Sequence, residues 1–137
     1  MNVNMTQEEV EKAIAKLKNG KASGVDGVIG EIVKYGGEDM VRALVMLFQE
    51  VWRREKIPKE WMKGVIFPIF KKGSRKEMNN YRGTLLLSVV GKVFAVVLND
   101  RVLEWAEGIL VEEQYGFRPN RGCRDPLFVS REVVRNR

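Results

Sequence analysis

The stretch that decides the fold is residues 65–88, VIFPIFKKGSRKEMNNYRGTLLLS. Its first part, 65–70, is short, aromatic and β-branched, which is typical of a β-strand. The polar residues 71–80 then read as a loop, and 81–87 return as a second strand. Pro68 cannot donate to a sheet ladder, so it indicates an edge strand or a bend. The stretch therefore predicts a β-hairpin with a long basic tip.

Helical patterns lie on both sides of this hairpin. Thr6 and Glu9 form a capping box before apolar residues at helical spacing. The strongest pattern covers residues 38–55, with one wide apolar stripe, and Asp26 is expected to cap a short helix before it. Ser88 is an expected N-cap for a long helix after the hairpin. The sequence thus predicts an α+β fold, mostly helical, with one two-stranded antiparallel hairpin.

Length and composition indicate a single globular domain. The chain has 137 residues, of which 45% are hydrophobic and 31% charged, as expected of one folded domain. We divide it into a helical part, 1–60, and a part, 61–137, that contains the hairpin and the following helices. No apolar stretch reaches the roughly 18 residues that span a bilayer, and the N-terminus lacks a signal-peptide pattern. We therefore expect no membrane association.

The residue types that are missing exclude several classes of site. The chain has no histidine and one cysteine, Cys123. It therefore has no Ser/His or Cys/His catalytic pair, no internal disulfide and no zinc cluster. A lone cysteine suits a reducing compartment, so we expect an intracellular protein, with nucleus and cytoplasm both open.

The excess positive charge lies in two blocks. Residues 1–60 carry ten basic and ten acidic residues. Segment 71–92 has a net charge of +5, segment 93–117 of −4, and segment 118–137 of +4. Such clustering is expected of a protein that binds a polyanion. On charge alone, a solvated basic surface on an ordinary domain stays equally open.

Three motifs resemble segments of one family. The first is residues 19–27, NGKASGVDG, and the last is residues 113–121, EQYGFRPNR. The second motif lies between them and has three pieces: PIFKKG at 68–73, NNYRG at 79–83 and LLSVVGKVF at 86–94. In order and spacing they resemble the N-terminal, or fingers, portion of the reverse transcriptases (RNA-directed DNA polymerases) of non-LTR, LINE-type retrotransposons. The resemblance covers residues 7–135.

The resemblance implies a nucleotide site on the hairpin. In this family the fingers sheet closes over the incoming dNTP, and a Lys after the first strand and an Arg on the second hold its triphosphate. These positions match Lys71 and Arg82, with Lys72 as the alternative to Lys71. The alternatives are a solvated hairpin tip for the two lysines and a surface salt bridge for Arg82.

The resemblance also implies contacts to an RNA or DNA template. The residues that it places near the template strand are Lys92, Phe117, Arg118 and Arg121. Phe117 either packs or offers a surface for base stacking, and packing is favoured. The family's N-terminal loop, also near the template, matches residues that we expect to serve mainly as turn formers. They are Gly24, Asp26 and Gly27.

The metal-binding carboxylates of the family find no match. Nucleotidyl transfer uses two Mg²⁺ held by paired carboxylates, which in this family lie in the palm domain. This sequence has no Asp-Asp pair. The resemblance therefore implies a truncated polymerase that lacks its palm, needs no cofactor in this part and is inactive alone. The alternatives are a stand-alone nucleic-acid-binding module and a functionless folded relic, and exposed tryptophans would favour self-association.

Overall fold

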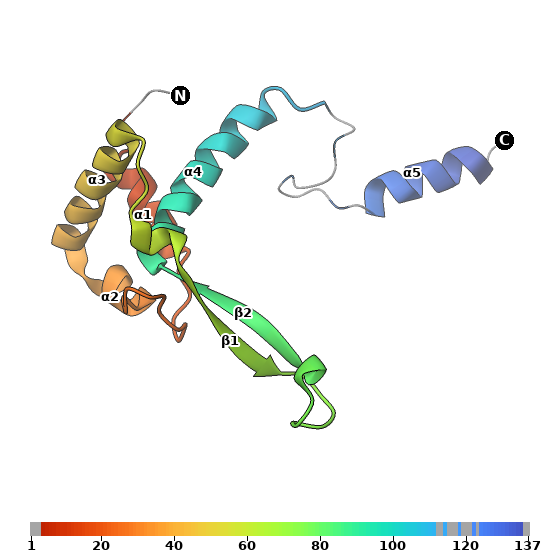
Figure 1. Cartoon of the computed structure of the whole chain (residues 1–137). Coiled ribbons are helices and arrows are strands. Elements are labelled where there is room, and N and C mark those ends of the chain that lie inside the picture. Colours follow the sequence, from red (N-terminus) through yellow and green to blue (C-terminus); the bar gives the residue numbers. More distant parts are fainter. Residues whose placement is uncertain (1–3, 112–113, 115–117, 119–121, 123, 136–137) are drawn as a thin grey trace. The chain divides into compact units, whose positions relative to one another are not determined.

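The fold is known from a computed structural model that describes residues 4–111, 114, 118, 122 and 124–135 (Figure 1). Phe117, Arg121 and Cys123 lie outside the described residues. The elements, in order, are α1 (Gln7–Ala15), α2 (Gly30–Tyr35), α3 (Gly37–Arg54), β1 (Gly64–Phe70), β2 (Tyr81–Leu87), α4 (Val89–Glu107) and α5 (Arg124–Arg135). Short 3₁₀ turns precede each strand, at Lys59–Met62 and Met78–Asn80. The prediction of a mostly helical α+β fold with one antiparallel hairpin is confirmed.

The chain forms two compact units, residues 1–98 and 99–137. The first contains α1, α2, α3, the hairpin and the first half of α4; the second contains the rest of α4 and α5. No helix in the described ranges is long and apolar enough to cross a membrane. The assignment of 1–137 to a single domain stays a prediction.

A helical core occupies the first unit. Phe48 of α3 is completely buried, and its ring packs edge-on against Phe94 of α4 and against Trp61, with centroids 5.2 and 6.0 Å away. Apolar residues spaced three and four apart on each helix turn one stripe inward, which buries them against the other helices. The buried apolar side chains of these helices are Val10, Ala13, Ile14, Val33, Leu44, Phe48, Val51, Val89, Val93, Phe94 and Val97.

Two of the predicted N-caps are confirmed, at the starts of α1 and α4. At α1, the Thr6 hydroxyl accepts from the Glu9 N–H, and the Glu9 carboxylate accepts from the Thr6 N–H at 2.7 Å, which confirms the capping box. At α4, the Ser88 hydroxyl accepts from the Gly91 N–H at 3.1 Å. Each cap satisfies backbone donors that the first helical turn leaves without partners.

The prediction that Asp26 caps α2 is wrong. That helix begins at Gly30, and its N-cap, Ile29, makes no side-chain capping bond. The Asp26 carboxylate instead accepts from the N–H of Val28, two residues on, at 3.2 Å. Aspartate readily closes such a local turn, which competes with helix capping. Asp26 is therefore a turn former, as expected for this loop.

The register of the hairpin determines which side chains share a face. The antiparallel pairs run from Gly64 with Leu87 to Phe70 with Tyr81. Because side chains alternate along a strand, the pairs divide between two faces. One, here called the arginine face, carries Phe67 with Thr84 and Ile69 with Arg82. The other, the tyrosine face, carries Ile66 with Leu85 and Phe70 with Tyr81.

Both faces of the hairpin expose apolar side chains. Ile66 on the tyrosine face is 72% exposed, and Phe67 on the arginine face is 58% exposed. A two-stranded sheet is marginally stable unless one face packs against another element. The hairpin therefore offers two surfaces that the helical core of the first unit leaves open.

Candidate nucleic-acid interface

The hairpin tip is ordered by its own hydrogen bonds. The Lys71 N–H donates to the Asn80 carbonyl at 2.8 Å, which extends the ladder one residue beyond β1. The Asn80 side-chain amide donates to the Ser74 carbonyl at 2.8 Å and to the Glu77 carboxylate at 3.2 Å. Gly73 has a φ of 91° and lies against this amide, so a side chain there would collide with Asn80. Asn80 thus fixes the loop that carries the basic residues.

Arg75 is anchored on the aromatic pair at the end of the hairpin. Its guanidinium lies 5.4 Å from the centre of the Phe70 ring, within the range of a cation–π interaction. The Tyr81 hydroxyl donates to the Arg75 carbonyl at 2.9 Å, and the Phe70 and Tyr81 rings meet edge-on at 5.5 Å. These contacts support the tip from its tyrosine face. Sequence reasoning did not assign Arg75 a role, because its neighbours lie five and six residues away across a loop.

Lys71 and Arg82 come together on the opposite face. Alternation beyond Phe70 places Lys71 on the arginine face, diagonal to Arg82 across the strand pair. Diagonal neighbours in a sheet lie about 7–8 Å apart. Both side chains are exposed, and among the described residues neither has an ion-pair or hydrogen-bond partner. Two neighbouring cations without a carboxylate form a site that favours a multivalent anion. Lys72, the next residue, is exposed at the tip.

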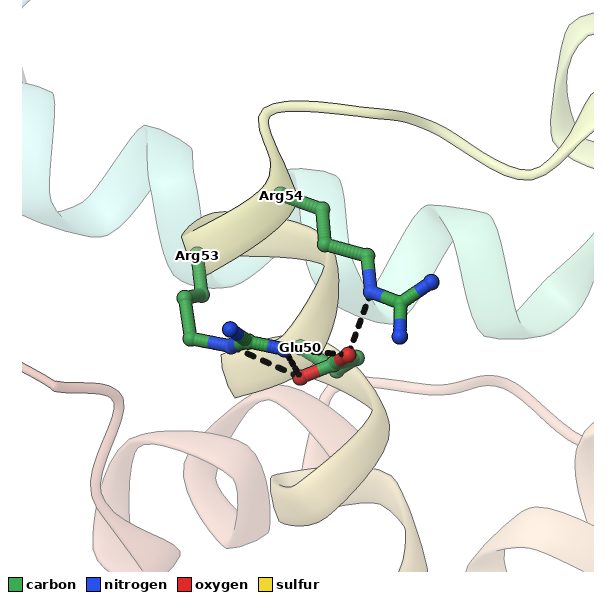
Figure 2. A network of polar contacts seen from close by, with 3 residues as sticks. All are labelled: Glu50, Arg53 and Arg54. Atoms are coloured by element: carbon green, nitrogen blue, oxygen red, sulfur yellow. Dashed lines mark hydrogen bonds and ion pairs between the residues drawn. The ribbon is translucent and has the colours of Figure 1, made fainter.

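Cations on α3 have the opposite environment. Arg53 donates to the Glu50 carboxylate at 2.7, 2.9 and 3.0 Å, and Arg54 binds the same carboxylate (Figure 2). Hydrogen bonds from Arg53 and then from Arg54 lower the pKa of Glu50, and the same contact raises the pKa of Arg53. The carboxylate therefore offsets the positive charge at this end of α3. A phosphate would have to compete with Glu50 for these guanidinium groups.

Lys92 lies away from the hairpin tip. It is in the first turns of α4, beyond the far end of β2, whose seven residues span about 20 Å at roughly 3.3 Å each. Its half-buried side chain borders an apolar hollow of about 270 Å³ that Ile57 and Trp61 also line. The structure thus does not gather Lys92 with Lys71 and Arg82.

The loop before α2 packs against the base of the hairpin. A Cβ on Gly24 would lie 2.5 Å from the Ser88 nitrogen and 2.8 Å from the Leu87 carbonyl oxygen. Only glycine permits this approach of two backbones. Gly27 has a φ of +69°, which also favours glycine. Gly24 therefore sets the contact between this loop and the junction of β2 with α4.

The start of the same loop is tied to α2. The Gly20 N–H donates to the Glu31 carboxylate, and this bond lowers the pKa of Glu31. The Lys34 ammonium donates to the Leu17 carbonyl at 3.0 Å. The loop between α1 and α2 thus has one end fixed to a helix and its middle fixed to the hairpin base.

Arg118 lies in the second unit, and its environment differs from that of Arg82. Its guanidinium pairs with the Glu107 carboxylate at 2.7 Å, and its side chain is only 7% exposed. The other two expected template residues, Phe117 and Arg121, lie outside the described residues. Of the four expected template contacts, the structure therefore describes only Lys92 and Arg118, and it places them in different environments.

The residues that the structure describes do not fit a two-metal site. Such a site needs carboxylates gathered around the ions. Within the described residues, no group of three or more Asp, Glu, His or Cys side chains is placed to hold a metal ion. No catalytic step through a metal is therefore derived for these residues.

Comparison with known proteins places the chain among mobile-element proteins. No protein-family model matches it. It is 33% identical over 122 residues to a 115 kDa protein in type-1 retrotransposable element R1DM of Drosophila melanogaster, a match that covers 85% of this chain. Four proteins of Drosophila mobile elements that are named RNA-directed DNA polymerases, two of them as probable ones, match at 29–32% identity over 80–90% of the chain. The chain is related to the reverse transcriptases of non-LTR retrotransposons.

These relatives are much longer than the chain. With the polymerase from mobile element jockey of Drosophila funebris, the identity is 29% over 126 residues, which is 90% of this chain and 14% of that protein. The R1DM protein is covered over 12% of its length. The matches confirm the resemblance drawn from the three motifs. The roles of individual residues stay predictions.

Proposed function

We propose that these residues form the fingers portion of a retrotransposon reverse transcriptase, which binds template nucleic acid and the incoming dNTP in the intact enzyme. The observation that carries the proposal is the juxtaposition of Lys71 and Arg82 on one face of an ordered hairpin. Both cations are exposed and lack a described partner. The relationship to RNA-directed DNA polymerases supplies the ligand chemistry.

The proposed nucleotide site uses two different cations for one triphosphate. The planar guanidinium of Arg82 can donate two parallel hydrogen bonds to phosphate oxygens in a fixed geometry. Lys71 adds a compact positive charge from the neighbouring strand, and Lys72 is the alternative for it. Because Asn80 and Gly73 order the loop between them, the two strands present these groups with little loss of backbone freedom.

The proposed template contact is electrostatic and independent of sequence. Segment 71–92 carries six basic residues and one acidic residue. Neutralising a phosphate with a lysine or arginine releases bound counterions, so affinity falls as salt rises. The exposed hairpin tip is the described part of this segment that fits such a role.

Catalysis is proposed to require residues outside this chain. The two Mg²⁺ of the intact polymerase would be held by palm carboxylates, for which the chain supplies no matching group. We expect the 137 residues alone to give no template-dependent extension with Mg²⁺, a primed template and dNTPs.

The experiment that tests the proposal is Arg82→Lys in an active polymerase in which these residues are joined to the remaining polymerase part of the jockey element. Loss of one charge-assisted contact of about 1.5–3 kcal/mol lowers kcat/KM for dNTP roughly ten- to hundredfold. Lysine cannot replace the two-pronged contact, so even this conservative change fails. Template affinity stays nearly unchanged.

Arg53→Lys on α3 is the matched control, because Arg53 is bound to Glu50 and lies outside the proposed site. It is expected to leave kcat/KM for dNTP unchanged. Normal nucleotide kinetics with weakened template binding in Arg82→Lys would instead move Arg82 to the template groove. The triphosphate would then be left to Lys71 and Lys72.

A further inference from the structure

The guanidinium of Arg118 is almost fully occupied by the protein itself. Its Nε donates to Glu107 Oε1 at 3.1 Å and its Nη2 to Glu107 Oε2 at 2.7 Å, a parallel two-bond pair. Its Nη1 donates to the carbonyl oxygens of Val111 at 2.9 Å and Gln114 at 3.4 Å. Since arginine has five N–H donors, few are left for an outside ligand.

Burial makes this arrangement hard to exchange for a phosphate contact. The Arg118 side chain is 7% exposed, whereas the Glu107 side chain is 43% exposed. Only the guanidinium is buried, so an outside phosphate could reach it only after the Arg118 side chain left its present acceptors. A template phosphate would have to displace a carboxylate and two carbonyl groups before it could bind.

The position of Glu107 explains how its pairing with Arg118 stabilises the end of α4. Glu107 is the last residue of α4. A carboxylate there faces the negative end of the helix dipole, and a cation at the same place is favourable. Arg118 neutralises this carboxylate and, through Val111 and Gln114, ties the chain that leaves α4 back to the end of the helix.

We propose that Arg118 is a positioning residue, which holds Val111 and Gln114 at the end of α4 and makes no contact with template phosphates. Two experiments test this proposal. The first measures hydrogen–deuterium exchange without any nucleic acid, so it does not depend on the proposed function. The second measures RNA binding and rests on the proposed function.

The first experiment compares Arg118→Ala with Glu107→Gln by hydrogen–deuterium exchange of the full chain. Both changes are expected to speed exchange of the hydrogen-bonded Ile109, Leu110 and Gln114 amides by tenfold or more, and the double variant is expected to add little to either single one. Arg118→Lys does not restore protection, because an ammonium cannot make the parallel pair. Peptides from α3 report that the first unit stays folded.

The matched controls change the same charges at sites that do not touch the pair. Glu104→Gln removes a carboxylate from an exposed position on α4, and Arg131→Ala removes an exposed guanidinium from α5. Neither is expected to alter exchange of the Ile109, Leu110 and Gln114 amides. Unchanged exchange in Arg118→Ala would overturn the proposal.

The second experiment measures binding to a single-stranded RNA as a function of salt. A positioning residue leaves the slope of log K against log salt the same in Arg118→Ala as in Arg131→Ala, and the same in Glu107→Gln as in Glu104→Gln. A direct phosphate contact predicts a slope shallower by about 0.7 in Arg118→Ala. It also predicts tighter binding in Glu107→Gln than in Glu104→Gln, since that change frees the guanidinium. Either result would return Arg118 to the template.

Discussion

The helical part of the first unit and its hairpin use the same residue types in opposite ways. In the helical part, Phe48 is completely buried and Arg53 is bound to a carboxylate. In the hairpin, Phe67 is 58% exposed and Arg82 has no described partner. Phe48 and Arg53 are thus engaged within the helical part, whereas Phe67 and Arg82 of the hairpin stay available. Exposed apolar side chains and unpaired charges on a stable scaffold are available to contact a ligand, so binding sites are expected among them.

The largest expected effect tests the apolar half of this contrast. Phe48→Ala is expected to lower the free energy of unfolding by about 3–5 kcal/mol, because it opens a cavity between α3, α4 and Trp61. Phe67→Ala removes the same ring from an exposed strand position and is expected to cost under about 1 kcal/mol. Urea unfolding followed by tryptophan fluorescence measures both.

Equal losses of unfolding free energy in Phe48→Ala and Phe67→Ala would contradict this contrast between a buried and an exposed ring. They would mean that the hairpin face is covered in solution, for example by a second copy of the chain. Sedimentation at two protein concentrations would then show association that Phe67→Ala weakens.

A smaller effect on stability is expected where the loop before α2 packs against the base of the hairpin. Gly24→Ala places a methyl group 2.5 Å from the Ser88 nitrogen, and the backbone there cannot move cheaply. We expect a loss of about 1–3 kcal/mol in the free energy of unfolding, typical of overpacking. Gly30→Ala is the matched control, since its nearest added contact is an ordinary 3.8 Å. If both substitutions leave the midpoint of urea unfolding unchanged, the loop is not packed on the hairpin base.

Local signals in the sequence predicted most of the fold. Thr6 and Glu9 lie at capping-box spacing, and Ser88 stands directly before a helical pattern, so both helix starts follow from neighbouring residues. The strand bounds of β2 were predicted at 81–87, between the polar loop 71–80 and the expected N-cap Ser88. Asp26 was misassigned because a carboxylate can close a turn or cap a helix, and the sequence does not separate the two.

The surroundings of the candidate residues were not predictable in the same way. Lys71 and Arg82 were found through their motifs, but their shared face depends on the register of the two strands. The pairing of Arg118 with Glu107 joins residues eleven apart in the sequence, of which only Glu107 lies in α4. The close approach of Gly24 to Ser88 joins residues 64 positions apart, and no local pattern marks it.

The measurement that tests the central claim most directly is a salt titration of single-stranded RNA binding by two double variants of the full chain. Lys71→Ala with Lys72→Ala removes two cations from the hairpin tip, and Arg53→Ala with Arg54→Ala removes two that Glu50 already engages. We predict that the first pair makes the slope of log K against log salt shallower by about 1.4, at roughly 0.7 per phosphate on a single strand. The second pair is expected to leave the slope unchanged. Equal slopes in the two double variants would contradict the claim that the exposed hairpin tip contacts the nucleic acid.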